Sequence, residues 1–273
     1  MLQHVTIAFI GAGMMGEAMI AGLLKEQLVP ADQIIATGPR PERREALQEK
    51  FGIRVTDDNR EAAQAADVLV FSLKPQTLPK VLPTLRGAVT SKDLVLSIIA
   101  GATIATFRDT LGHAAIVRAM PNTPAQIAEG MTVWTATEAV TEQQQGMAAT
   151  ILGALGQEHY VADEKYLDMA TALSGTGPAY CFLLLEAMVD AGVHMGFPRR
   201  VAEELVLQTM HGSVLFAMQS GKHLAELRNM VTSPGGTTAE ALHALERGGL
   251  RTVMADGIWA AYRRAQDLGG KTK

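Results

Sequence analysis

Short apolar runs alternate with amphipathic segments through the first half of the chain. Their nearly continuous apolar character is typical of strands that are covered on both faces of a sheet. They predict strands at Val5–Ile10, Gln33–Ala36, Ile53–Thr56, Asp67–Leu73, Leu94–Ile99, Ala114–Met120, Met131–Ala136 and Glu158–Val161. Helices are predicted after the first strand as far as about Glu26, and at Pro41–Phe51, Asn59–Ala65 and Thr141–Leu155. This alternation predicts an α/β fold with a Rossmann-type, doubly wound, mostly parallel sheet.

The strand pattern stops after about Ala162, and the remaining sequence is helical. Helices are predicted at Asp163–Ala172, Pro178–Gly192, Pro198–Ser220, Lys222–Val231, Thr238–Arg247 and Leu250–Leu268. We therefore expect a dinucleotide-binding domain over residues 1–162 and an all-α domain over residues 163–273. Two helical stretches, Tyr180–Val193 and Val201–Met218, are apolar almost all round. A domain this small buries little of that surface alone, so we expect an intertwined oligomer.

The composition narrows the class of protein. A net charge of −4 and the absence of a basic run argue against nucleic-acid binding. The single cysteine, Cys181, excludes an internal disulfide and suits the cytoplasm, and the seven scattered histidines suggest no metal site. The apolar stretch Pro178–Val193 contains Glu186 and Asp190, so we expect a buried helix there rather than a membrane span. The N-terminal sequence shows no signal-peptide pattern.

A glycine motif follows the first predicted strand at once. The sequence Gly11-Ala12-Gly13-Met14-Met15-Gly16 has the spacing G-x-G-x-x-G between a strand and a helix. In such turns the first glycine allows a tight bend, the second lets the backbone approach a pyrophosphate, and the third lets helix and strand pack closely. The motif predicts dinucleotide binding, although an ordinary glycine-rich turn would look the same.

The end of the second predicted strand bears on the choice of dinucleotide. An NAD-preferring site usually carries an acidic residue there, whereas this chain has Thr37-Gly38-Pro39-Arg40. A hydroxyl and a guanidinium favour NADPH, with NADH as the alternative; Arg43 and Arg44 fit a solvated helix start equally well. Later strand ends carry Ser72, Lys74, Ala100 and Asn122, and these should gather at one edge of the sheet, where the nicotinamide would lie.

The stretch Val231–Gly249, in the all-α part, is predicted to be a tight glycine-rich loop that opens a short helix, which Gly248 and Gly249 end. Pro234, Gly235 and Gly236 interrupt the preceding segment, and Thr237 with Glu240 fits a capping box that makes Thr237 the N-cap. The first-turn N–H groups would then be available to a small carboxylate, with the Thr238 hydroxyl beside them. An ordinary capped turn is the simpler interpretation of this stretch taken alone.

Several motifs resemble those of one family, the Δ1-pyrroline-5-carboxylate reductases, which make proline. The resemblance covers nearly the whole chain. Its motifs are Phe9-Ile-Gly-Ala-Gly13, Lys74-Pro-Gln76, Met120-Pro-Asn-Thr-Pro124, Ser174-Gly-Thr-Gly-Pro-Ala-Tyr180, Met195-Gly-Phe-Pro-Arg199, Thr232-Ser-Pro-Gly-Gly-Thr-Thr238 and Leu245-Glu-Arg-Gly-Gly-Leu-Arg251. The family usually has serine where Thr176 stands.

The resemblance implies an NAD(P)H-dependent reduction of a cyclic imine to L-proline, with roles for particular residues. The loop Ser233–Thr238 would bind the substrate carboxylate, and Thr238 would be the catalytic hydroxyl at the ring nitrogen. Substrate-binding positions would be Glu164, Ser174, Ser233, Gly235, Gly236, Thr237 and Thr238. Dinucleotide positions would be Ile10, Gly11, Ala12, Gly13, Met14, Met15, Thr37, Asn59, Ser72, Leu73, Lys74 and Ala100, to which the residue-level arguments add Gly16, Arg40 and Asn122. The resemblance also implies a homodimer through the helical domain, often assembled into a ring of dimers.

Two other functions compete with this one. A β-hydroxyacid dehydrogenase would share the glycine-rich start and a helical second domain. Members of that class, however, resemble each other in carrying a catalytic lysine on a helix after a glycine-rich loop. The helix after Gly177 contains no lysine. A dinucleotide-dependent sensor without turnover would have lost the loop Ser233–Thr238, which is intact here. Reduction of an imine needs mainly positioning and electrostatics, so a hydroxyl such as that of Thr238 suffices.

Overall fold

The computed structural model describes residues 2–270, and the chain divides into two compact units. The first comprises Met1–Pro178 together with Ala261–Lys273, and the second comprises Ala179–Ala260. The boundary predicted after Ala162 lies earlier than this division, because the helical segment that follows it packs on strands of the first unit. Each unit is described by itself below.

The first unit is built on one eight-stranded sheet. Its strands run in the order β3-β2-β1-β4-β5-β6-β7-β8. Neighbours from β3 to β6 pair in parallel, β7 is antiparallel to β6, and β8 is parallel to β7. The strands are β1 Ile7–Ile10, β2 Ile34–Thr37, β3 Arg54–Thr56, β4 Val68–Phe71, β5 Leu94–Ser97, β6 Ile116–Met120, β7 Gly130–Ala136 and β8 Gly156–Tyr160. The predicted doubly wound, mostly parallel sheet is therefore confirmed.

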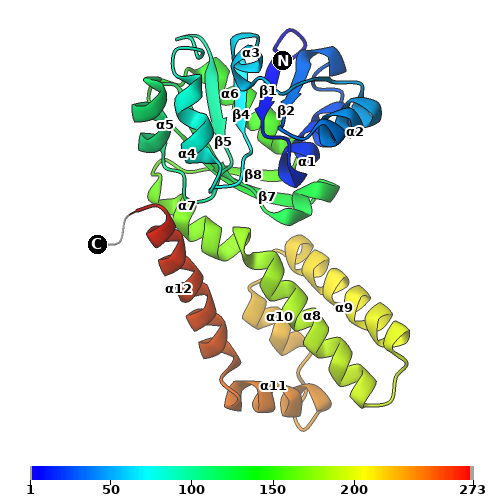
Figure 1. Cartoon of the computed structure of the whole chain (residues 1–273). Helices are drawn as coiled ribbons and strands as arrows, with labels where there is room; N and C mark the ends of the chain where they lie inside the picture. Colours follow the sequence, from blue (N-terminus) through cyan, green and yellow to red (C-terminus); the bar gives the residue numbers. More distant parts are fainter. Residues whose placement is uncertain (1, 271–273) are drawn as a thin grey trace. The chain divides into compact units, whose positions relative to one another are not determined.

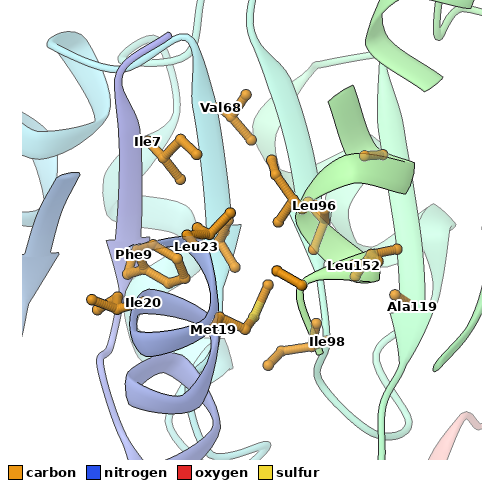
Figure 2. Close-up of a cluster of buried hydrophobic side chains, with 14 of the residues drawn as sticks. Ile7, Phe9, Met19, Ile20, Leu23, Val68, Leu96, Ile98, Ala119 and Leu152 are labelled. Carbon is orange, nitrogen blue, oxygen red and sulfur yellow. The ribbon is translucent and has the colours of Figure 1, made fainter. Parts of the chain in front are cut away.

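Helices cover both faces of the sheet (Figure 1). One face packs against α1 (Met14–Lys25), α2 (Pro41–Phe51) and α6 (Glu142–Gly153). Figure 2 shows Met19, Ile20 and Leu23 of α1 and Leu152 of α6 beside strand side chains such as Phe9 and Leu96. The other face packs against α3 (Asn59–Gln64), α4 (Leu78–Val81) and α5 (Ile104–Leu111). Burial of both faces explains why the strands read as continuous apolar runs.

The crossovers that carry α4 and α5 were not predicted as helical. Both helices are short, and Pro79 and Pro83 interrupt the pattern of the first one and the 3₁₀ turn η2 (Leu82–Leu85) that follows it. Further 3₁₀ turns lie at η1 (Ala31–Gln33) and η3 (Thr123–Ile127). The capping box that starts α6 joins Thr141 and Gln144.

A long helical segment leads out of the sheet. Helix α7 (Lys165–Ala170) continues through a π-helical turn, η4 (Thr171–Gly175), into α8 (Gly177–His194). By length and composition alone, the stretch Lys165–His194 is long and apolar enough to cross a membrane. The prediction of a buried helix at Pro178–Val193 is wrong for the single chain, since Val189 and Gly192 are the buried residues of α8. The other helices of the second unit are too few to cover α8.

The remaining helices of the all-α part match their predicted positions closely. They are α9 (Arg199–Ser220), α10 (Leu224–Met230), α11 (Thr237–Arg247) and α12 (Leu250–Leu268). Between residues 179 and 260 the buried residues are Val189, Gly192 and Ala202. Large apolar side chains such as Phe182, Phe216 and Met218 are more than half exposed. The surface expected to be covered by an oligomer is therefore open on this chain.

Candidate active site

The loop between β1 and α1 has the geometry of a dinucleotide-binding turn. Gly11 has a φ of +85°, and a Cβ there would lie 2.3 Å from Leu73 Cδ2. A Cβ at Gly16 would lie 2.8 Å from Ser72 Oγ, so this glycine lets α1 pack closely against the end of β4. Around the Cβ position of Gly13 no heavy atom lies within 4 Å. The tight turn and the close packing are confirmed, and the open space at Gly13 fits a pyrophosphate.

Two hydroxyl side chains form hydrogen bonds to the backbone of the β1–α1 loop. Thr37 Oγ1 accepts the N–H of Gly11 at 3.0 Å, and the Thr37 carbonyl accepts the N–H of Ala12 at 3.0 Å. Ser72 Oγ donates to the Gly11 carbonyl at 2.7 Å. Because Thr37 is only 2% exposed, its observed role is to support the loop. Its direct contact with a dinucleotide stays a prediction.

Three arginines line a pocket of about 190 Å³ beside the glycine loop, together with Thr37, Ser72, Leu73 and Lys74. Arg43 donates to the Ala12 carbonyl at 3.3 Å and forms an ion pair with Glu17. Arg44 donates to the Gly38 carbonyl at 2.6 Å. Both are tied to the protein, so the interpretation as a freely solvated helix start is wrong. The Arg40 side chain is exposed and has no hydrogen-bond or ion-pair partner among residues 2–270.

A second pocket, of about 260 Å³, lies where several strands end. Its lining brings together Met15, Ser72, Leu73, Ile98, Met120, Pro121, Asn122, Thr123 and Gly175. Asn122 uses both ends of its amide within the protein: Oδ1 accepts the N–H of Met131 at 2.9 Å, and Nδ2 donates to the Ser174 carbonyl at 3.1 Å. Asn122 therefore joins β7 and η4 at the pocket wall. The predicted gathering of strand ends is confirmed for Ser72 and Asn122.

Other predicted cofactor positions lie around these pockets. Lys74 is exposed and lines the first of them. Ala100 lies on a separate, mostly apolar pocket of about 400 Å³, which also contacts Pro75 and Leu268. Asn59 begins α3 and lines neither of the two dinucleotide pockets. Ile10 is buried at the end of β1, whereas Met14 is 74% exposed at the start of α1.

A charged cluster centred on β6, two residues before the pocket-lining Met120, was not predicted. Arg118 of β6 is 3% exposed and forms ion pairs with Glu164 at 2.7 Å and with Asp168 at 3.1 Å. Glu164 Oε1 also accepts the N–H of Ile104, the first residue of α5, at 2.9 Å. The sequence carried one signal, since a buried arginine in an otherwise apolar strand requires anionic partners. Glu164, a predicted substrate position, is thus held by the protein on one carboxylate oxygen.

The loop before α11 differs from the predicted cap. Gly236 is the N-cap of α11, Thr237 is its first residue, and no side chain caps the helix. The capping box of Thr237 with Glu240 is therefore wrong, because the helix begins one residue earlier than that motif requires. Gly235 has a φ of +68°, and the Gly236 N–H donates to the Ser233 carbonyl at 3.1 Å. Without a capping side chain, the first-turn N–H groups face a potential anion directly.

The hydroxyls of this loop are differently placed. Thr238 is half-buried, while Thr237 and Ser233 are exposed. The Thr238 hydroxyl has no hydrogen-bond partner among the described residues. A Cβ at Gly236 would lie 2.4 Å from Ser233 Oγ, so a larger residue there would require the Ser233 side chain to turn away. The loop offers unpaired donors and one partly shielded hydroxyl, as a carboxylate-bearing ligand would require.

The sheet order, the glycine loop and the basic pocket define a dinucleotide-binding protein of the Rossmann class that carries an additional helical domain. Residues 6–101 match the family model described as NADP oxidoreductase coenzyme F420-dependent. Residues 164–268 match the model described as pyrroline-5-carboxylate reductase dimerisation.

Curated relatives and solved structures extend the match over the whole chain. Pyrroline-5-carboxylate reductase from Synechocystis is 40% identical over 98% of this chain and 100% of its own, and the enzyme from Pseudomonas aeruginosa is 41% identical over 96% of each. The Coxiella burnetii structure superposes with a TM-score of 0.90 at 37% identity, covering 97% of this chain and 98% of its own. The Plasmodium falciparum structure, with NADP bound, gives 0.89 at 29% identity, covering 98% and 99%. The chain belongs to the pyrroline-5-carboxylate reductase family.

Proposed function

We propose that this protein reduces L-1-pyrroline-5-carboxylate to L-proline with NADPH as hydride donor. The observation that carries the proposal is identity of 40% to a reductase of that name over the full length of that relative. The open turn at Gly13 and the uncapped start of α11 support it, since one suits a pyrophosphate and the other a carboxylate. These two features would also suit a sensor without turnover or a β-hydroxyacid dehydrogenase, so the identity to the named reductase is what favours imine reduction.

The residues of the chain divide the work of this reaction. Gly11–Gly16 and the pocket with Arg40 would hold NADPH, which supplies a hydride when bound. The N–H groups at the start of α11, with the turn Ser233–Gly236, would hold the substrate carboxylate. The Thr238 hydroxyl would form a hydrogen bond at the ring nitrogen. The carbon of the protonated imine accepts the hydride, the electron pair of the C=N π bond moves onto nitrogen, and the nitrogen keeps its proton and becomes a secondary amine.

The direct test is consumption of NADPH with L-1-pyrroline-5-carboxylate, followed at 340 nm, with proline identified as product. We expect turnover that depends on both substrates. Folded protein that binds NADPH but consumes none would favour the sensor. Oxidation of a β-hydroxyacid with NADP⁺, without activity on the cyclic imine, would favour the dehydrogenase.

We also propose that Arg40 recognises the 2′-phosphate of NADPH. Of the three arginines at this pocket, Arg43 and Arg44 form hydrogen bonds within the protein, whereas the guanidinium of Arg40 has no partner among residues 2–270 and is available to a ligand. Arg40→Gln should raise KM for NADPH by roughly 10- to 100-fold, the value of a charge-assisted hydrogen bond, and change KM for NADH little. Arg86→Gln, at an exposed position away from the pocket, is the matched control. Equal effects on both dinucleotides would exclude this role.

The assembly we propose is a homodimer formed by the helical domain. The dimerisation model matched by residues 164–268 and the exposed apolar side chains of α8 and α9 support it. A ring of such dimers, a cytoplasmic location, and the absence of nucleic-acid or membrane partners complete the proposal. A light-scattering mass of the purified protein distinguishes a dimer from a larger ring.

A further inference from the structure

Arg118 is a deeply buried charged side chain on the strand that leads to the second pocket, and its surroundings give it a specific arrangement. It lies on β6 between Ile116, which packs in the core under α5, and Met120, which lines the pocket. Alternation along a strand places these three side chains on the same face of the sheet. Arg118 thus separates the apolar core from the pocket, directly below a residue of the pocket wall.

The partners of Arg118 come from a different part of the chain. Glu164 is the N-cap of α7 and Asp168 follows four residues later within that helix, so both side chains lie on the same side of it. Arg118 Nη1 binds Glu164 Oε1 at 2.7 Å, and Nη2 binds Asp168 Oδ1 at 3.1 Å. The planar fork of arginine suits two carboxylates at once, which lysine does not. The guanidinium therefore fixes both the position and the rotation of α7 against β6.

Helix α7 in turn sets the wall of the pocket. It runs without a break into the π-helical turn η4, which ends at Gly175. Gly175 lines the pocket, and a Cβ there would lie 2.8 Å from Met120 Cε. Asn122 holds the same turn through the Ser174 carbonyl. A π-helical turn of this kind is an irregularity that is found frequently at functional sites.

The cluster of Arg118, Glu164 and Asp168 also carries a net charge. Two carboxylates and one guanidinium carry one net negative charge when all three are ionised. Glu164 is the partly exposed member, with 27% of its side chain accessible, whereas Arg118 and Asp168 are each at 4%. A fixed negative charge near this pocket would favour the cationic imine and the positive charge that develops on a dinucleotide as it loses a hydride.

We propose that Arg118 and Asp168 are positioning residues for hydride transfer, acting through α7, the turn Thr171–Gly175 and the carboxylate of Glu164. This inference rests on the proposed function, because it assigns the second pocket to the reacting end of the dinucleotide. Neither residue touches the ligands. Their role is to hold in place the pocket wall at Thr171–Gly175 and the carboxylate of Glu164, which would contact the ligands.

Arg118→Met is the main test. We expect kcat to fall by roughly 10- to 100-fold, the order of loss that a misplacement of about an ångström causes, while the Kd for NADPH changes less than about threefold. With NADPH deuterated at the transferred position, the isotope effect on kcat should increase, since hydride transfer itself is slowed. A loss of folded molecules alone would lower activity without changing the isotope effect. Arg108→Met is the control, since Arg108 is exposed on α5 and pairs with the exposed Asp109.

Two further variants separate positioning from stability. Arg118→Lys keeps the charge but not the fork, so it should recover part of kcat. Asp168→Asn should cost less in the Arg118→Met background than alone, because both substitutions disrupt one network. Unchanged kcat in Arg118→Met, or in both Arg118→Lys and Asp168→Asn if the methionine variant does not fold, would overturn the proposal. So would an unchanged isotope effect beside a lower kcat.

A measurement without turnover keeps this inference distinct from the proposed function. Amide hydrogen exchange across residues 164–177 should be faster in Arg118→Met than in Arg108→Met, and equal exchange would refute the positioning role. Absence of imine reduction by the unmodified protein would instead refute the proposed function, whatever the exchange result.

Discussion

At the scale of single residues, the start of α11 separates two adjacent threonines. Thr238 is half-buried with no partner for its hydroxyl among the described residues, whereas Thr237 is exposed and does not cap the helix. A hydroxyl that no described protein group engages, beside the unsatisfied N–H groups of the first turn, is available to a ligand. The geometry therefore favours Thr238 over its neighbour as the residue that meets a reacting atom.

Thr238→Ala should lower kcat for imine reduction by roughly 10- to 100-fold while the Kd for NADPH changes little, because the role proposed for the hydroxyl is at the ring nitrogen and not on the dinucleotide. Steady-state kinetics and a fluorescence titration with NADPH measure the two quantities. Thr84→Ala, at an exposed position far along the chain from both loops, serves as control. An unchanged kcat would remove Thr238 from the mechanism.

Residue types near the dinucleotide loop were easier to predict than residue roles. Thr37, Arg43 and Asn122 lie close to the predicted pockets, but each is used to hold the protein together. The sequence shows that a hydroxyl, a guanidinium or an amide is present, but their partners depend on which strands and helices become neighbours. Arg118 shows the converse, since its role appears only when α7 packs against β6.

At the scale of elements, the glycine loop makes two demands that substitution can separate. A Cβ at Gly16 would meet Ser72 Oγ at 2.8 Å, whereas a Cβ at Gly13 meets no protein atom within 4 Å. Gly16→Ala should therefore destabilise the protein by about 1–3 kcal/mol and lower Tm by several degrees. Gly13→Ala should leave Tm nearly unchanged but weaken NADPH binding at least tenfold, because its methyl would occupy the pyrophosphate space.

Differential scanning calorimetry and NADPH titration of the same two variants check this pair. The prediction is of opposite patterns, stability lost in one variant and affinity in the other. Normal NADPH affinity in Gly13→Ala would mean that the pyrophosphate does not lie over this turn.

Helices α1 and α2 are joined by a charge cluster that should respond to pH. The hydrogen bond from Lys50, with that from Arg43, holds the pKa of Glu17 below its usual range, against the opposing effect of burial. A carboxyl whose folded pKa is depressed stabilises the protein above its unfolded pKa, near 4.5, and this contribution is lost as pH falls through the folded pKa. This stabilisation should be small, because the cluster lies at the surface.

Glu17→Gln should therefore lower Tm by about 1–3 °C at pH 7, and the difference from the unmodified protein should begin to shrink as pH falls below about 4.5 and vanish once pH is below the folded pKa of Glu17. Thermal melts over this pH range measure it. Glu45→Gln, at an exposed position on α2 with no ion pair to any of residues 2–270, should show no difference at any pH. A difference for Glu17→Gln that persists undiminished at low pH would contradict the assigned cause.

Element types followed from the sequence where one physical signal dominated. Strands buried on both faces and long helices such as α9 and α12 were predicted within a few residues. The short helices α4 and α5 and the turn η4 were not, because they have too few residues for periodicity and owe their conformation to tertiary packing. The wrong capping box has a related cause. A shift of one residue in the start of α11 decides whether Thr237 is the N-cap or the first residue of the helix.

At the scale of the whole molecule, the two units differ in how much of their apolar surface they cover. The sheet unit has a continuous core on both faces, whereas residues 179–260 bury only Val189, Gly192 and Ala202. The sequence predicted this imbalance from helices that are apolar almost all round. It did not predict which side chains stay exposed, because that depends on how the helices turn against each other.

Phe216 tests whether this surface forms the dimer. It is 53% exposed on α9, and burying a phenylalanine in an interface contributes about 1.5–3 kcal/mol, whereas burying an unpaired arginine there costs several. The unmodified protein should have the mass of a dimer or a multiple of it by light scattering. Phe216→Arg should shift the mass towards the monomer and abolish most activity, while Gln208→Arg, at a polar exposed position of the same helix, should do neither. A monomeric unmodified protein with full activity would show that the exposed helices have another purpose, and a dimeric Phe216→Arg would place the contact on the other exposed side chains of α8 and α9.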